Sequence, residues 1–397
     1  MPILNYFITY SGCRLMLIST GLAAACLCNA EVTPPLIASD VFIHPSILGA
    51  SSCATSGCHG GASEKSLQYA VWSQRDVHSR SFATLTTARS ARMAEALNIP
   101  DPTVSTRCTT CHAPFHAVQV ATPGLLAPDA RVNEGVSCAS CHGPAGDWLR
   151  SHTRTDYTHA DKVAAGMKEL GDLNARAGSC VACHQNIDTD LVVTGKHPRL
   201  IFELDGQTAS QPRHWRETAN YNGAQAWQVG QWVALREVSW AMLQQTASVD
   251  EIQRWQALVW LMQRAEGPDA VSAGVAGDAR LAEPGPENYA RARDIAARQA
   301  RALATSFNSA QVSVLLRNLA STHAEFLDSK IASLQHAYRA ERLVLALDRL
   351  LNALPAEKRS PDASARLTKL FAQVQSIPGF QPVEFSQSLD AFARTLR

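Results

Sequence analysis

The chain has 397 residues and a formal net charge of +1, with 36 Lys and Arg against 35 Asp and Glu. This balance excludes the strongly basic surface on which nucleic-acid binding depends, and the length exceeds one ordinary hydrophobic core, so two domains are expected. Residues 1–30 contain an apolar run after Arg14 and end in Asn29-Ala30, which predicts a cleaved signal peptide. A retained anchor and a lipidated Cys26 are the alternatives.

Four cysteine pairs, each followed at once by a histidine, come next. In a C-x-x-C-H motif, one helical turn presents both thiols to the vinyl groups of one haem, and the histidine binds the iron from the proximal side. The sequence therefore predicts four covalently bound c-type haems. The first pair has four intervening residues, and a disulfide is its alternative. The motifs are Cys53, Cys58 and His59; Cys108, Cys111 and His112; Cys138, Cys141 and His142; Cys180, Cys183 and His184.

Residues 31–215 are predicted to form the tetrahaem cytochrome c domain. This segment is rich in Gly, Ser, Thr and Pro and has few long periodic stretches, as expected where porphyrin replaces side chains in the core. Short helices are predicted over residues 69–85, 88–97 and 160–170.

Residues 216–397 contain no cysteine and are predicted to form an all-α domain. Helices are expected over residues 224–245, 248–265, 288–307, 311–327 and 330–354, followed by two weaker segments. Ser248 and Glu251 have the spacing of a capping box, and Pro355 ends the fifth helix. Five of the eight tryptophans lie between Trp227 and Trp260 and are expected to pack the bundle. The predicted fold class is thus mainly α, a multihaem domain with short helices followed by a helical bundle.

The second axial ligands must come from histidines outside the motifs. A second histidine makes the iron six-coordinate and suited to electron transfer. Seven candidates suffice for four irons, so bis-histidine ligation of every haem stays open, whereas His323 and His336 are expected to be ordinary helix residues. The candidates before residue 215 are His44, His78, His116, His152, His159, His197 and His214.

The order of these motifs resembles the tetrahaem cytochrome c-554 family over about residues 50–215. The residues that carry the resemblance are the first cysteine motif, Trp72, Asp76-Val77-His78, the run from Glu134 to Pro144 (EGVSCASCHGP) and His152. The later Gly195-Lys196-His197-Pro198-Arg199-Leu200 resembles a G-H-P-R-L motif of larger multihaem relatives, with Lys196 inserted.

The resemblance also implies a ligand pairing. It implies His152 opposite His59, and His78 opposite His142. A later histidine, here His197, would lie opposite His184. The haem on His112 would be five-coordinate, with an open iron face. His116 follows His112 too closely to bind the same iron, and His116 and His214 complete the distal candidates.

Three functions are compatible with these observations. The favoured one is an exported, periplasmic electron carrier that exchanges electrons with redox partner proteins. The second is a haem enzyme acting on nitric oxide, nitrite or hydroxylamine at an open iron on His112, with Arg107 and Glu134 as candidate proton-handling residues. The third is a haem subunit or docking module of a larger redox complex, which an apolar patch on the bundle would favour. Peripheral membrane association and the oligomeric state stay open.

Overall fold

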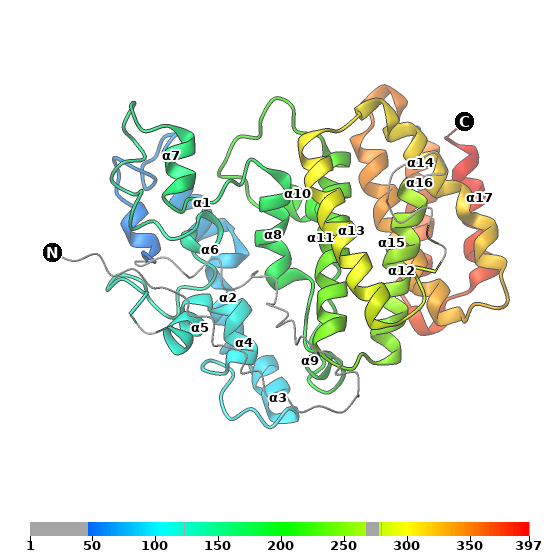
Figure 1. Ribbon diagram of the computed structural model, residues 1–397, viewed down its shortest axis with the longest axis horizontal. Helices are drawn as coiled ribbons and strands as arrows, with labels where there is room; N and C mark the ends of the chain where they lie inside the picture. The colour runs from blue at the N-terminus through cyan, green and yellow to red at the C-terminus, as the bar shows by residue number, and fades with distance from the viewer. Residues whose placement is uncertain (1–46, 123, 267–277, 279, 397) are drawn as a thin grey trace, which may run out of the picture. The chain divides into compact units, whose positions relative to one another are not determined.

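The computed structural model describes residues 47–122, 124–266, 278 and 280–396 (Figure 1). Within these ranges there are seventeen α-helices, several 3-10 turns and no strand, apart from one isolated bridge between Ile47 and Leu126. The predicted mainly α fold is therefore confirmed. The same ranges hold no helix with the length and apolar character that crossing a membrane requires. The predicted signal peptide and His44 lie outside the described residues.

The part of the chain that carries the cysteine motifs is built from ten short helices. The second, third and fourth motifs each end a helix at the motif histidine, as the chemistry of the motif predicts, whereas the first begins at the last residue of the 3-10 turn Ala50–Cys53. The helices are α1 (Gln68–Arg75), α2 (Ser81–Leu85), α3 (Ala88–Ala96), α4 (Thr106–His112), α5 (Pro114–Ala121), α6 (Cys138–His142), α7 (His159–Ala164), α8 (Leu173–His184), α9 (Thr189–Val193) and α10 (Leu204–Ser210).

The helix predicted over residues 69–85 is interrupted. Asp76 has an extended backbone that ends α1, and its side chain accepts a hydrogen bond from the backbone N–H of His78, which starts the 3-10 turn Val77–Arg80. A short polar side chain that bonds to the backbone in this way favours a helix start over a helix interior. The prediction of a helix over residues 88–97 is confirmed by α3, and the one over 160–170 ends early, at Ala164.

Few apolar side chains fill the interior around the first three motifs. The buried cluster there consists of Ile47, Phe115, Val118 and Ala139. Single fully buried core residues normally touch six to twelve others, so a cluster of four is too small to hold a segment of this length together. This deficit is what we expect where prosthetic groups occupy the interior.

The C-terminal half contains seven helices, most of them longer. Five predicted helices are found within a few residues of their expected bounds, except that residues 311–327 divide into α14 and the 3-10 turn Ser321–Leu327. Ser248 and Glu251 form the predicted capping box, because each side chain accepts a hydrogen bond from the other's backbone N–H. The helices are α11 (Gly223–Gln244), α12 (Val249–Glu266), α13 (Pro286–Thr305), α14 (Val312–Ala320), α15 (Ser333–Ala353), α16 (Pro361–Val374) and α17 (Pro382–Arg394).

One apolar core holds these helices together. Trp227 and Trp232 of α11 and Trp255 of α12 are among its largest fully buried side chains, which confirms the packing role expected for the tryptophans. Helix α11 runs beside α13 and also packs against α8 and α10 (Figure 1). Because Leu173 and Val181 of α8 belong to the same core, the apolar packing continues across the domain boundary predicted at residues 215–216, and that boundary stays a prediction.

Candidate functional site

Each of the four motif histidines faces the ring of one histidine from outside the motifs. The ring centroids of His59 and His152 lie 6.2 Å apart, and those of His78 and His184 lie 6.0 Å apart. The other two pairs, His112 with His197 and His142 with His214, each have a separation of 6.3 Å. Every pair thus combines one predicted proximal ligand with one distal candidate.

This spacing is the one that an iron between two imidazoles requires. An imidazole nitrogen lies about 2 Å from the metal it binds, and the ring centroid lies roughly 1 Å beyond that nitrogen. Two imidazoles on opposite faces of one metal therefore have centroids about 6 Å apart. The described residues hold no cluster of three or more His, Cys, Asp or Glu side chains suited to a metal ion. A two-histidine site fits a metal whose remaining ligands come from a porphyrin.

The pairing differs from the one implied by the resemblance at three of the four motifs. His152 faces His59 as expected. His78 faces His184 instead of His142, and His142 faces His214.

The local contacts of His78 explain the first difference. Its backbone carbonyl does accept a hydrogen bond from Val136, two residues before the third motif, at 3.0 Å. Its imidazole, however, is held by Asp76 through Nδ1 at 2.9 Å, and the ring lies against that of His184. The backbone of His78 thus lies beside the third motif, although its ring faces that of His184.

The second difference concerns the expected open iron on His112. His197 was expected opposite His184, but its ring lies beside that of His112. The chain after α9 makes this approach, with the backbone N–H of His197 bonded to the Leu191 carbonyl at 2.9 Å. The geometry therefore supplies a distal partner where the resemblance implied none.

The remaining histidines have other contacts. Nδ1 of His116 lies 3.2 Å from the Thr109 hydroxyl, and His159 pairs with Glu169 through Nε2. The expectation that His336 and His323 are ordinary residues agrees with their surroundings: Nε2 of buried His336 lies 3.1 Å from the Asp328 carbonyl, and Nε2 of His323 lies 3.8 Å from Asp390.

Five of the eight paired histidines are hydrogen-bonded at Nδ1, whereas Nδ1 of His214 is buried without a partner. Nδ1 of His59 meets the Gln68 side-chain oxygen at 3.1 Å, and Nδ1 of His112 meets the Thr84 hydroxyl at 2.9 Å. The Nδ1 atoms of His78, His152 and His197 have similar partners. A bond at Nδ1 fixes the tautomer and leaves Nε2 available for a metal.

Burial favours the neutral imidazole that metal binding requires. Desolvation, with smaller contributions from His214 and His59, lowers the pKa of His142 to about 4. Burial also lowers the pKa values of His112 and His184. These rings are therefore unprotonated at neutral pH, ready to bind iron.

The motif cysteines come together in pairs from different motifs. The structure places none of these eight cysteines in a disulfide. The side chain of Cys53 lies close enough to that of Cys138 to shift its pKa, and Cys111 and Cys183 are neighbours in the same way. The first motif thus adjoins the third, and the second adjoins the fourth.

Arg107 and Glu134, the candidate proton-handling residues, have structural roles. Arg107 forms an ion pair with Asp188 and lies 3.2 Å from Asp190, which ties α4 to α9. Glu134 accepts hydrogen bonds from the backbone of Ala50, at 3.0 Å, and from the Ser137 hydroxyl.

Several supporting residues were not found by sequence reasoning. Gln68, Thr84 and Asp76 each hold a motif or partner histidine through Nδ1. Only Asp76 had a signal in the sequence, because a carboxylate two residues before a histidine can reach its ring in a turn. Gln68 and Thr84 are unremarkable polar residues until the fold brings them to the rings.

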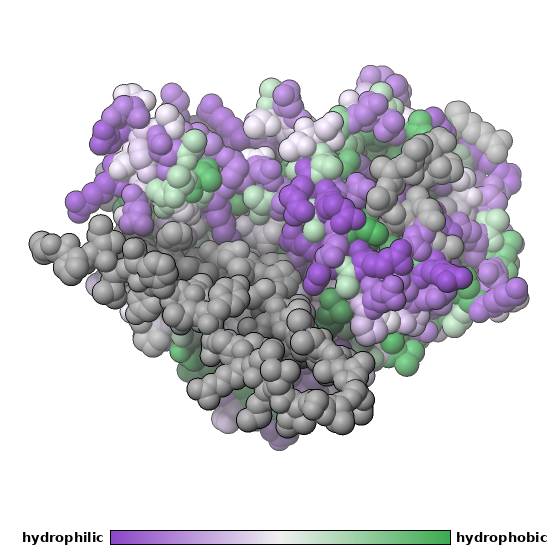
Figure 2. Space-filling view, in the orientation of Figure 1, coloured by the Kyte–Doolittle hydropathy of each residue, from purple (hydrophilic) through white to green (hydrophobic). Residues whose placement is uncertain are grey.

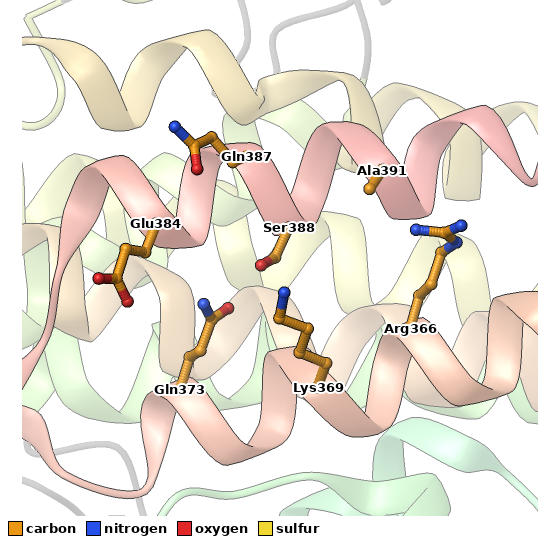
Figure 3. Close-up of a pocket in the computed structure, with 7 residues that line it drawn as sticks. All are labelled: Arg366, Lys369, Gln373, Glu384, Gln387, Ser388 and Ala391. Carbon is orange, nitrogen blue, oxygen red and sulfur yellow. The ribbon is translucent and has the colours of Figure 1, made fainter.

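Two cavities lie among the described residues. The larger, of about 410 Å³, lies between α16 and α17 and is lined by polar side chains such as Arg366, Lys369 and Glu384 (Figure 3). Lys369 and Gln373 point from α16 toward α17, where Ser388 and Glu384 face them. The second, of about 190 Å³, lies beside the segment that follows His184.

Comparison with known proteins connects the motif region to one family. Residues 52–143 match the family model described as cytochrome c554 and c-prime. This stretch contains the first three cysteine motifs and His78 and ends before His152. The predicted resemblance is confirmed over this part of the chain. Searches of curated proteins and of solved structures gave no match.

Proposed function

We propose that this chain, whose residues 52–143 match the family model described as cytochrome c554 and c-prime, is a c-type cytochrome of that family and an exported electron carrier with four covalently bound haems. The observation that carries the proposal is the set of four histidine ring pairs, with centroids 6.0 to 6.3 Å apart. An iron held between two imidazoles is low-spin and exchanges single electrons without binding a substrate.

The chain's own residues hold and orient the prosthetic groups. Each cysteine pair would hold one haem through two thioether bonds, with the adjoining histidine as an iron ligand. His152, His214, His78 and His197, whose rings face those of His59, His142, His184 and His112, would supply the second ligands. Hydrogen bonds at Nδ1 hold five of these eight rings in place.

The contacts between motifs support a spatial order that differs from the order in the sequence. Cys53 touches Cys138, and Cys111 touches Cys183. Cys141 is close enough to Cys180 for a charge on one to raise the pKa of the other. The motifs are therefore ordered first, third, fourth and second, and electrons would enter or leave at the first and second motifs, the two ends of this row.

Redox partner proteins and a periplasmic location belong to the same proposal. The first is required because an electron carrier needs a donor and an acceptor. The second follows from the predicted signal peptide over residues 1–30 and from haem attachment through cysteines, which takes place outside the cytoplasm. Mass spectrometry of the purified holoprotein tests export, because cleavage after Ala30 gives a mature chain that begins at Glu31.

The enzyme alternative needs an open iron on His112. His197 lies opposite His112 with its ring centroid 6.3 Å away, and Arg107 and Glu134 are engaged in ion pairing and hydrogen bonding. No observation favours this alternative over the carrier.

The docking-module alternative needs an apolar patch on the C-terminal helices. Their large exposed apolar side chains are single residues spread along the chain, such as Val249, Val314 and Val383. On the face in Figure 2, hydrophilic side chains separate the apolar ones. This scatter is typical of an ordinary protein surface and adds no support to the docking module.

The test is a haem count together with an electron paramagnetic resonance spectrum of the oxidised holoprotein. We expect four haems per chain and a purely low-spin spectrum, because each iron would have two histidine ligands in addition to the four porphyrin nitrogens. A high-spin component in the wild-type protein would contradict the proposal, as would fewer than four haems.

The variant His197→Ala assigns the result to one iron. It removes the partner of His112, so about one iron in four should become high-spin and bind carbon monoxide when reduced. His116→Ala is the matched control, since His116 lies near the same motif but contacts Thr109. An unchanged spectrum in the His197 variant would show that His197 is not a ligand.

A further inference from the structure

The smaller cavity, of about 190 Å³, is lined by segments from both halves of the chain. Residues 185–189, which directly follow His184, form one wall with α9 and with residues 199–201. Side chains of α11, α12 and α15 form the other walls. The cavity therefore lies between the segment that follows His184 and the C-terminal helices.

Arg342 of α15 is the unusual residue of this cavity. It is only 7% exposed, and its Nη1 atom is buried without a hydrogen-bond partner. Desolvation lowers the pKa of Arg342 to about 10, so the guanidinium still carries its charge at neutral pH. A buried charge without a partner is costly, so an anion beside the Arg342 guanidinium would offset this cost.

The other charged side chains around the cavity are already satisfied. Arg254 and Arg199 both pair with Asp250, at 3.2 and 2.8 Å. Glu251 forms the capping box with Ser248.

The two remaining carboxylates are engaged as well. Asp188 pairs with Arg107, and Glu341 lies 3.4 Å from Arg254. Among the described residues that line or adjoin the cavity, Arg342 is thus the cation for which no carboxylate is within ion-pair distance.

The rest of the lining is mostly apolar. Val192 and Ile201 lie on the haem-ligand side, and Val238 and Met242 come from α11. A site with one buried guanidinium and several aliphatic side chains suits a ligand with one charged end and a short apolar body. An inorganic oxyanion such as sulfate would leave the apolar walls without contacts.

We propose that this cavity binds a carboxylate on a short aliphatic arm, with the carboxylate on Arg342 and the arm against Val238 and Met242. Two sources have this chemistry: a free short-chain monocarboxylate, or a propionate of a haem bound beside the cavity. The second source rests on the proposed haem binding, and the first does not.

Isothermal titration calorimetry of the oxidised holoprotein with butyrate tests the free ligand. We expect butyrate to bind the wild type saturably and to bind Arg342→Met at least ten-fold more weakly. Butylamine, which has the aliphatic arm without the negative charge, should not bind. Arg339→Met is the matched control, because Arg339 is on the same helix but lies over the Trp260 ring and outside the cavity; its affinity should equal that of the wild type.

If butyrate does not bind, the infrared difference spectrum between reduced and oxidised holoprotein decides. A carboxylate band that shifts in Arg342→Met but not in Arg339→Met would identify a haem propionate as the occupant. If butyrate does not bind and no carboxylate band shifts selectively in Arg342→Met, the proposal is wrong. If Arg342→Met does not fold, Arg342→Lys takes its place, because lysine retains the positive charge. This variant should bind butyrate more weakly than the wild type or show a displaced carboxylate band. An electron paramagnetic resonance spectrum is recorded for each variant. A low-spin spectrum shows that haem ligation is intact, so a negative binding result then counts against the cavity and not against the haem proposal.

Discussion

At the scale of single residues, the contact between Asp76 and His78 places a buried carboxylate against one of the paired histidines. Asp76 is 1% exposed and accepts hydrogen bonds from His78 Nδ1 and from Gln211, both at 2.9 Å. Burial opposes its ionisation, but these hydrogen bonds outweigh burial and lower the pKa of Asp76 to about 2. An ionised carboxylate behind an imidazole makes the ring a stronger donor to the metal.

The variant Asp76→Asn should therefore raise the reduction potential of one haem. The amide oxygen still accepts from Nδ1, but the negative charge that stabilises oxidised iron is lost. In a spectropotentiometric titration of the holoprotein, we expect one of four potentials to move upward while the spectrum stays low-spin. Asp156→Asn, at an exposed carboxylate paired with Arg154, should change none. A fall or no change in all four potentials would refute the role of Asp76.

At the scale of elements, the start of α12 joins the two halves of the chain. Ser248 and Glu251 form the capping box, and the same Glu251 side chain accepts a hydrogen bond from the hydroxyl of Thr189 in α9. Residues 185–189, between His184 and α9, are therefore fixed to the bundle by a contact that depends on the helix cap. A local sequence signal thus has a tertiary consequence.

Replacing Ser248 with Ala should destabilise the protein by about 1 kcal/mol, because one backbone N–H at the helix start loses its acceptor. Urea denaturation followed by far-ultraviolet circular dichroism measures this loss. Ser364→Ala, at an exposed interior position of α16, is the control and should change stability by a few tenths of a kcal/mol at most. Equal effects of the two substitutions would mean that the cap does not stabilise α12.

At the scale of the whole molecule, a buried acidic cluster connects α10 to the long helix α15. Glu203 caps α10 by accepting from the backbone of Asp205 and Gly206, and it lies 3.9 Å from Arg349 of α15. Desolvation is the main reason that the pKa of Glu203 rises from 4.5 to about 7. The packing of the two halves thus encloses a carboxyl group that prefers its proton.

This burial makes stability depend on pH. Between pH 4.5 and 7 the folded protein holds the Glu203 proton more tightly than the unfolded chain does, so the free energy of unfolding falls as pH rises through this window. The contribution is at most about 3 kcal/mol. Glu203→Gln removes it, so the fall between pH 5 and pH 7.5 should be smaller in the variant than in the wild type. Glu357→Gln, at an exposed position, should retain the wild-type slope, and an identical slope in Glu203→Gln would contradict the prediction.

The helices of the C-terminal half were largely predictable, because each depends on the periodicity of apolar residues and on cap and proline signals within a few positions. The helix over residues 69–85 was not, because Asp76 uses its side chain to stop α1 and start the next turn. The small elements α5, α9 and α10 were also missed, since five to eight residues contain too few turns for a periodic signal.

The sequence by itself determined the attachment chemistry: two thiols and a histidine within one turn define a c-type haem motif, because all three groups reach the same ligand locally. Only the tertiary structure decided which histidine faces which. His78 faces His184 and His197 faces His112, contrary to the order implied by the resemblance. These partners come from distant positions, and their meeting depends on how α8, α9 and the loops after them pack, which no local pattern records.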